Sequence, residues 1–376
     1  MAYYNGKKVF SVVAVLGGGL EQPTLFAPII TSGLNTVSWA NDTRNGAFPV
    51  TLSATVDGVE VTSPLTITEE MDGKTLEVTA SATNFEAAST TETLRFLDIS
   101  SLLFESDNNF TLRTNNNSKN WNGTLEYSTD ESTWTTWAGT NTISSANGKL
   151  YLRGTNNTHI THANLRQFVF TGSGIRCLGN IENLLDFVAV ANGEHPTMDT
   201  NCFLGLFNGC TALTVAPALP ATTLAVQCYM GMFSGCTALT VAPALPATTL
   251  ETGCYRAMFM GCTALTTAPA LPALEAVSSC YAKMFNGCTA LVVLPALPAT
   301  MVRNSAYGEM FSGCSSLVIN SAQSASAPYE FRIPTSGTVT FEYGAVTSMF
   351  ANTGGDMTSD PSANTTYYTT HEPVAA

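Results

Sequence analysis

The chain has 376 residues, and at about 150 residues per domain this length predicts two to three domains. Only 11% of the residues are charged, yet acids outnumber bases 28 to 15, for a net charge of −13. This balance excludes a nucleic-acid-binding protein that works by neutralising phosphates, because no basic excess exists. With 45% hydrophobic residues the chain can build cores, which argues against a disordered protein. The composition is more typical of an extracellular or virion β-protein than of a cytosolic enzyme.

Residues 1–20 form a candidate N-terminal arm. Lys7 and Lys8 precede a short apolar run from Val9 to Leu16, and three glycines follow. A signal peptide has the same order of features, so cleavage near residue 20 stays open. Because the apolar run is short and no clear small-residue cleavage motif follows, we favour a β-strand or an arm that packs on a neighbouring subunit.

Residues 21–97 alternate short strand-like runs with turn signals. Thr51–Val56 and Val59–Val61 flank Asp57-Gly58, a dipeptide typical of a two-residue hairpin. Short strands separated by such turns predict a small β-sandwich, and this stretch resembles immunoglobulin-like or fibronectin-like modules. We expect a second β module over residues 98–178.

From residue 202 the chain repeats with a period of 26 residues. Four copies begin at Cys202, Cys228, Cys254 and Cys280, and a fifth begins at Ala306 without the first cysteine. A fixed period in the twenties indicates a solenoid, in which each unit buries its apolar face against its neighbours. We expect the solenoid to cover residues 179–320 and a C-terminal cap and tail to cover 321–376, where Met349-Phe350 looks like a decayed sixth copy.

Within one copy, the pattern predicts a short helix and then a short strand. Tyr229, Met232 and Phe233 have the spacing of one helix face. Leu239–Val241 alternates as a strand does, and Pro243 should end that strand because proline has no N–H for the ladder. The expected fold is therefore mostly β, with N-terminal β-sandwich modules and a C-terminal solenoid of short parallel strands plus short helices.

The repeated string also resembles a known family. Met-Phe-x-Gly-Cys-Thr-Ala-Leu-x-x-x-Pro-Ala-Leu-Pro, over residues 202 to about 320, is similar to the BspA-type leucine-rich repeats of gut bacterial surface proteins and of phages that infect those bacteria. Members of this class are linked mainly to adhesion and surface interaction rather than to catalysis. Residues 2–9 are similar to the openings of phage head-fibre proteins.

These resemblances imply a non-enzymatic virion structural or attachment protein, such as a phage fibre or decoration protein, located on the virion surface. The alternative is a secreted adhesin on the bacterial cell surface. The implied partners are other virion proteins, bound through the N-terminal arm and β modules, a host surface protein or glycan, and further copies of the chain. Nucleic acid is not among them.

Nine of the ten cysteines fall into two columns of the repeat. The first column holds Cys202, Cys228, Cys254 and Cys280, and the second holds Cys210, Cys236, Cys262, Cys288 and Cys314. Within one copy the two cysteines are separated by about 12 Å along a helix, beyond the ~7 Å reach of a disulfide. The CxxC spacing of zinc sites does not occur. We expect buried thiols that act as small hydrophobic side chains.

The sequence contains no convincing catalytic, cofactor-binding or metal-binding constellation. His159 and His162 have the spacing of a ligand pair but no companion ligand, so exposed histidines are favoured over a zinc site. Glu69-Glu70 and Asp130-Glu131 are adjacent acids, whereas a glycosidase needs two carboxylates that face each other across a cleft. We expect no enzyme activity, no cofactor and no metal.

A binding surface, if the repeats have one, should follow columns of side chains along the solenoid. One candidate is the strand column, Thr214, Thr240, Thr266, Val292 and Val318. The other is the tyrosine column, Tyr229, Tyr255, Tyr281 and Tyr307, whose members are either core anchors or half-exposed contacts. Arg256, Lys283 and Glu309 should face solvent. Because the repeats are close to neutral, we expect hydroxyl-rich or apolar contacts with little salt dependence.

Overall fold

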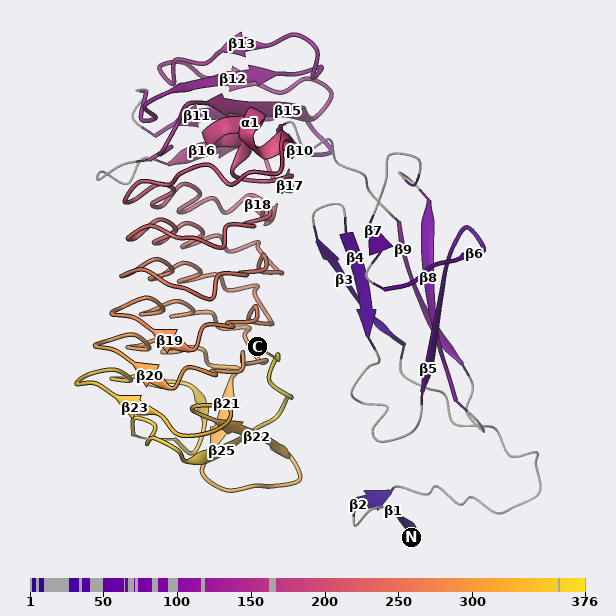
Figure 1. Cartoon of the computed structure of the whole chain (residues 1–376), viewed down its shortest axis with the longest axis vertical. Helices are drawn as coiled ribbons and strands as arrows, with labels where there is room; N and C mark the ends of the chain where they lie inside the picture. Colours follow the sequence, from indigo (N-terminus) through magenta and orange to yellow (C-terminus); the bar gives the residue numbers. More distant parts are fainter. Residues whose placement is uncertain are drawn as a thin grey trace. The chain divides into compact units, whose positions relative to one another are not determined.

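The computed structural model of the chain is mostly β, as predicted (Figure 1). It describes residues 2–4, 7–9, 27–33, 36–40, 50–63, 65–66, 71, 74–82, 87–93, 101–115, 119–161, 167–357 and 359–375. Within these ranges, α1 (Asn183–Ala191) is the one helix, and no helix is long and apolar enough to cross a membrane. The chain divides into two compact units, Met1–Phe96 and Leu97–Ala376.

The described residues of the first unit form three sheets. The hairpin of β1 (Ala2–Tyr4) and β2 (Lys7–Val9) opens the predicted arm, of which residues 10–20 lie outside the described residues. One three-stranded sheet has the order β3 (Ile29–Gly33), β4 (Thr36–Ala40), β7 (Leu65–Thr66). A four-stranded sheet has the order β6 (Val59–Glu60), β5 (Thr51–Val56), β8 (Thr75–Ser81), β9 (Ala88–Thr93).

The hairpin predicted at Asp57-Gly58 is confirmed. Both residues have positive φ, 48° and 84°, as a two-residue turn between twisted antiparallel strands requires. Strands β5 and β8, which pair in this sheet, bury alternate residues along much of their length, because successive side chains point to opposite faces of a sheet. Leu65 of the three-stranded sheet packs against this core, which consists of Ala54, Val56, Leu76 and Val78.

The second unit begins with two further sheets. The larger has the order β13 (Thr135–Thr136), β12 (Thr124–Ser128), β15 (Lys149–Thr155), β10 (Leu102–Glu105), β17 (Ile175–Leu178), β18 (Leu213–Val215). The smaller has the order β14 (Ile143–Ser144), β11 (Thr111–Thr114), β16 (Phe168–Thr171).

This β module and the repeats share one core. Strand β18 belongs to the first repeat, and it pairs in parallel with β17 of the module. Phe104 and Phe168 lie with their ring centroids 6.2 and 6.1 Å from that of Phe207 in the first repeat. The boundary expected at 178/179 therefore separates no cores. The division into two compact units falls at 96/97, next to the boundary expected at 97/98.

The repeats form coils that stack on one another (Figure 1). Coils 1 to 5 begin at Cys202, Cys228, Cys254, Cys280 and Ala306. Backbone hydrogen bonds join each coil to the next: the N–H groups of Phe203, Tyr229 and Tyr255 donate to the carbonyl oxygens of Cys228, Cys254 and Cys280, over 2.8 to 3.0 Å. Equivalent side chains therefore align in columns along the stack.

The predicted repeat helices are wrong. In coil 2, the N–H groups of Gly231, Phe233 and Gly235 donate to the next coil, while those of Met232 and Ser234 donate to the third residue before them. An α-helix would use all these N–H groups within its own segment. In the coil, every second N–H group instead donates to a carbonyl oxygen of the next coil.

Left-handed residues make this alternation possible. In coil 2 they recur every fourth position, with φ of 56° at Gln227, 60° at Gly231 and 73° at Gly235. Each reverses the local turn, so that the chain zigzags instead of winding into a helix. The residues predicted to share a buried face are nevertheless all buried.

The predicted strand forms in only some coils. It is present as β18 in coil 1 and as β21 (Val318–Asn320) in coil 5, but Leu239–Val241 of coil 2 is not a strand. A parallel ladder that the sequence does not predict forms further along the coil, from β19 (Glu275–Ala276), β20 (Met301–Val302) and β23 (Thr340–Phe341). It lies beyond the last proline of each repeat, where every residue again has an N–H to donate.

The C-terminal residues close the stack. Residues 344–352 form a partial sixth coil that accepts hydrogen bonds from coil 5, and the ring centroid of Phe350 lies 5.6 Å from that of Phe311. Phe331 of β22 (Tyr329–Arg332) meets Phe350 edge-on at 5.9 Å. Strand β25 (Thr366–Thr369) pairs with β21 and β22, and β24 (Gly354–Gly355) also pairs with β21. This is the atypical terminal unit that a repeat stack needs.

Candidate functional site

The stack exposes a column of hydroxyl groups that the sequence reasoning missed. Its members follow the second cysteine of each copy, and all five are exposed. We call them the outer hydroxyl column: Thr211, Thr237, Thr263, Thr289 and Ser315. The detectable signal was a polar residue kept at one place in every copy, directly after a buried cysteine.

The predicted strand column is accessible only in part. Thr240 and Thr266 are exposed, whereas Thr214, Val292 and Val318 are half-buried, and the Thr214 hydroxyl donates to the Ile175 carbonyl at 3.1 Å. The following column contributes apolar surface, since Val215 is 38% exposed and Val241 is 73% exposed. The accessible part of the predicted site therefore centres on coils 2 and 3.

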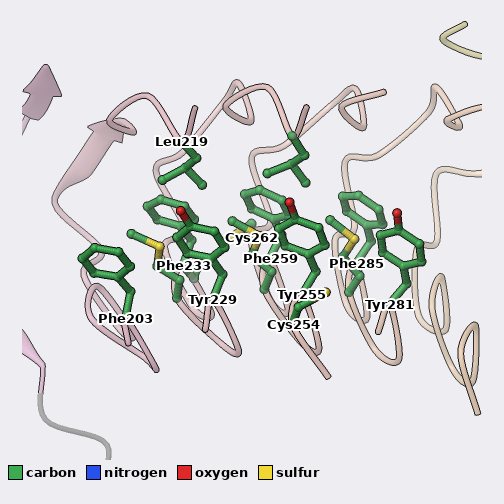
Figure 2. Packing of buried hydrophobic residues seen from close by; sticks show 14 of the residues in the cluster. Phe203, Leu219, Tyr229, Phe233, Cys254, Tyr255, Phe259, Cys262, Tyr281 and Phe285 are labelled. Atoms are coloured by element: carbon green, nitrogen blue, oxygen red, sulfur yellow. Dashed lines mark hydrogen bonds between the residues drawn. The ribbon is translucent and has the colours of Figure 1, made fainter. Parts of the chain in front are cut away.

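The tyrosine column is not a contact surface. Tyr229, Tyr255, Tyr281 and Tyr307 are at most 2% exposed, and neighbouring rings stack with centroids 5.9 Å apart. Figure 2 shows Tyr229, Tyr255 and Tyr281 in successive coils. Burial is the main cause that raises the pKa of all four phenols. Of the two alternatives that the sequence left open, core anchoring is the one observed.

Charged groups lie apart from the hydroxyl-bearing segments. No Asp, Glu, Lys or Arg occurs in residues 209–223, 235–250, 261–274 or 287–302. Lys283 and Glu309, predicted to face solvent, are each about 40% exposed and pair with each other at 3.2 Å. The nearby Arg303 bridges Glu275 at 2.7 Å and Glu342 at 3.0 Å. The segments with the exposed hydroxyls are therefore uncharged.

The cysteines are free and buried, as predicted. The second column does more than fill space, because each of its thiols donates a hydrogen bond to a phenylalanine carbonyl of the preceding layer. Cys236 Sγ lies 3.1 Å from the Phe207 oxygen, and Cys262 Sγ lies 3.1 Å from the Phe233 oxygen. Burial raises the pKa of Cys210 and Cys288 to about 12, so these thiols are not nucleophiles at neutral pH.

The histidines and acids singled out from the sequence are not assembled into a reactive site. His159 Nδ1 lies 3.5 Å from Asp199, and His162 and Glu69-Glu70 lie outside the described residues. Asp130 accepts backbone hydrogen bonds from Thr133 and Ser132, which lower its pKa and stabilise a turn. Among the residues that the structure describes, no group of three or more His, Cys, Asp or Glu side chains could hold a metal ion.

One buried acid was not predicted. Glu182 is almost fully buried at the start of α1, and its Oε2 lies 2.8 Å from Nδ1 of the half-exposed His195. Burial is the largest influence on its pKa, which is raised. Its charge also acts on the buried Cys202 thiol and the buried Tyr229 hydroxyl, whose pKa values burial raises, so the carboxylate–imidazole pair is better explained as a structural contact.

Comparisons with known proteins return no significant match. No family model, curated protein or solved structure is similar enough to this chain to place it in a family.

Proposed function

We propose that the chain is a non-enzymatic structural and attachment protein of a phage particle. In this proposal the stack of coils is a leucine-rich-repeat solenoid of the BspA type, and the N-terminal arm and β modules dock to other virion proteins. The observation that carries the proposal is the contrast between surface and interior. The repeats display rows of hydroxyl and small apolar side chains, while their thiols and phenols are buried.

The proposed contact surface consists of the outer hydroxyl column and the exposed members of the strand column. These side chains are uncharged, so they suit a host-surface protein or glycan that is bound through hydrogen bonds and apolar contacts. An uncharged interface gains little from long-range electrostatics, and its affinity should change little with ionic strength.

Mass spectrometry of purified phage particles tests this proposal. We expect peptides from the whole chain at a stoichiometry of many copies per particle, with residues 1–20 retained. Absence of the chain from particles would contradict the virion assignment.

The alternative function is a secreted bacterial cell-surface adhesin with the same repeats. The observation in its favour is the order of features in residues 1–20, with lysines, a short apolar run and glycines. A mature N-terminus near residue 20, found on chains recovered from bacterial cell surfaces, would favour this alternative.

A further inference from the structure

The last described residues of the chain return to the coils and add a short strand to coil 4. Val374 pairs in parallel with Pro295. The Val374 N–H donates to the Leu294 carbonyl oxygen at 2.8 Å, and the Val374 carbonyl oxygen accepts from the Ala296 N–H at 2.7 Å. We call residues 370–375 the terminal strap, and Figure 1 shows this end of the chain beside the coils.

The terminal strap lies where a regular stack would place coil 5. The Val293 N–H donates to Thr266 of coil 3, and the Val293 carbonyl oxygen accepts from Ala268 of the same coil. Because backbone groups alternate in direction along an extended strand, those of Leu294 point to the opposite side, toward the next coil. Coil 5 pairs there, as β21, with β24 and β25 instead of coil 4. The strap therefore satisfies an edge of coil 4 that coil 5 leaves open.

Coil 4 differs in sequence from the other coils at this edge. Leu294 stands where coils 1 to 3 have alanine, and it is fully buried. Ala296 is also buried, whereas the equivalent residue of coil 2, Ala244, is exposed. A larger apolar side chain thus occurs in the coil whose edge is covered. Coil 4 has the features of a site that accepts a strand.

Few contacts hold the terminal strap in place. In the described part of the chain, the two bonds of Val374 are the hydrogen bonds that join residues 370–375 to the coils. His371, Glu372 and Ala375 are exposed. A segment with so few bonds and so much exposed surface can open while the rest of the molecule stays folded.

We propose that the terminal strap is an exchangeable strand, and that coil 4 of one copy also accepts the strap of a second copy. The same backbone bonds form whichever copy supplies the strap, so exchange loses no contact. The exposed His371 and Glu372 form the hinge, because they can change direction without disturbing the interior. Exchange of an identical element is a low-cost route by which two copies of a chain associate.

Photo-cross-linking in a mixture of heavy-isotope and light-isotope copies tests the exchange. The full chain carries benzoylphenylalanine in place of Ala375, an exposed residue next to the pairing position. We expect cross-links from the strap to coil 4 that join a heavy chain to a light one. Their share should rise with protein concentration, because pairing with a second copy is bimolecular and closure on the same chain is not. Cross-links confined to single chains at every concentration would overturn the proposal.

Val374→Pro in the same cross-linking chain is the matched variant. It removes the N–H that donates to Leu294, so cross-links to coil 4 should be lost both within and between chains. Cross-links that persist unchanged would show that the strand pairing does not hold the strap, contrary to the proposal.

Hydrogen exchange of the natural full chain provides a second measurement that needs no variant. The Ala296 amide should exchange at least about tenfold faster than the Phe285 amide of the same coil, because only the first depends on the strap. The Phe285 N–H donates to Met310 of coil 5 at 2.9 Å. Equal protection of the two amides would mean that the strap does not open by itself, and the proposal would be wrong.

Discussion

The left-handed residues of the coils allow a pair of substitutions whose effects have opposite signs in a coil and in a helix. In coil 3, Ala257 has φ of 53° and Gly261 has φ of 74°. We predict that Ala257→Gly stabilises the protein and that Gly261→Ala destabilises it. In an α-helix the signs reverse, because glycine is about 1 kcal/mol less favourable than alanine there.

The magnitudes follow from the backbone conformation. The left-handed region costs a residue with a Cβ about 1–2 kcal/mol, and the greater freedom of glycine in the unfolded chain offsets about 0.4–1 kcal/mol of this. A Cβ built at Gly261 would lie 3.8 Å from the Gly235 backbone, which is an ordinary contact. Backbone strain, without a steric clash, therefore determines the stability loss of Gly261→Ala. We expect about 0.5–1 kcal/mol of stabilisation for Ala257→Gly and a similar loss for Gly261→Ala.

Hydrogen exchange on the amides of coil 3 is a suitable assay, because it reports the local opening free energy rather than that of the separate N-terminal unit. Gly313→Ala, at an equivalent position with φ of 78°, should reproduce the loss seen with Gly261→Ala in coil 5. Stabilisation by Gly261→Ala together with destabilisation by Ala257→Gly would contradict the coil conformation and support the helix that the sequence predicts.

Three further outcomes are expected. Burial raises the pKa of Cys210 and Cys288 to about 12, so iodoacetamide at pH 8 should leave the repeat thiols unmodified until the protein unfolds; rapid labelling of the native chain, read by mass spectrometry, would contradict their burial. Cys262→Ala removes the thiol donor to the Phe233 carbonyl and should cost about 1 kcal/mol in coil exchange, and no measurable loss would show that this bond contributes little. Burial raises the pKa of Glu182, so the folded state favours the protonated carboxyl. The resulting stabilisation of the folded state is fully present below the ordinary pKa of 4.5, and it is lost as the pH rises through the raised pKa of the folded state. In urea unfolding, the stability of Glu182→Gln relative to that of the natural chain should therefore increase as the pH rises from 4 to 7. A constant difference in stability across that range would disprove the effect.

The sequence predicted the period and the buried faces because repetition shows both directly. The columns of phenylalanine and cysteine are buried as expected, and the tyrosine column, for which the sequence left two alternatives open, is buried with them. The backbone between them was misassigned because hydrophobic spacing of i, i+3 and i+4 fits both a helix and a coil of successive turns. Gly231 and Gly235, four residues apart, were the available warning, since a helix rarely holds two glycines so close together. Coils 3 to 5 obscure this warning, because Ala257, Lys283 and Glu309 take the left-handed conformation without glycine.

The candidate surface was only partly predictable for a related reason. Sequence periodicity identifies which residues share a column, but the turns of the coil decide which columns reach the solvent. The outer hydroxyl column is exposed because Leu213, Leu239 and their equivalents turn inward two residues later and leave the preceding threonine outside. The thiol hydrogen bonds were equally unpredictable, because they depend on the position of a carbonyl in the neighbouring layer.

The central claim is that uncharged side chains on the outer surface of the stack attach the particle to its host. Binding of the purified full chain to host cells tests it most directly, with Thr211→Glu, Thr237→Glu and Thr289→Glu combined in one variant. A control with the same added charge carries Thr222→Glu, Thr248→Glu and Thr300→Glu, at exposed positions of the same coils outside both columns. We predict that the natural chain and the control bind equally well at low and high salt, and that the first variant fails to bind. Undiminished binding of that variant, or binding by the natural chain that is lost at high salt, would contradict the claim.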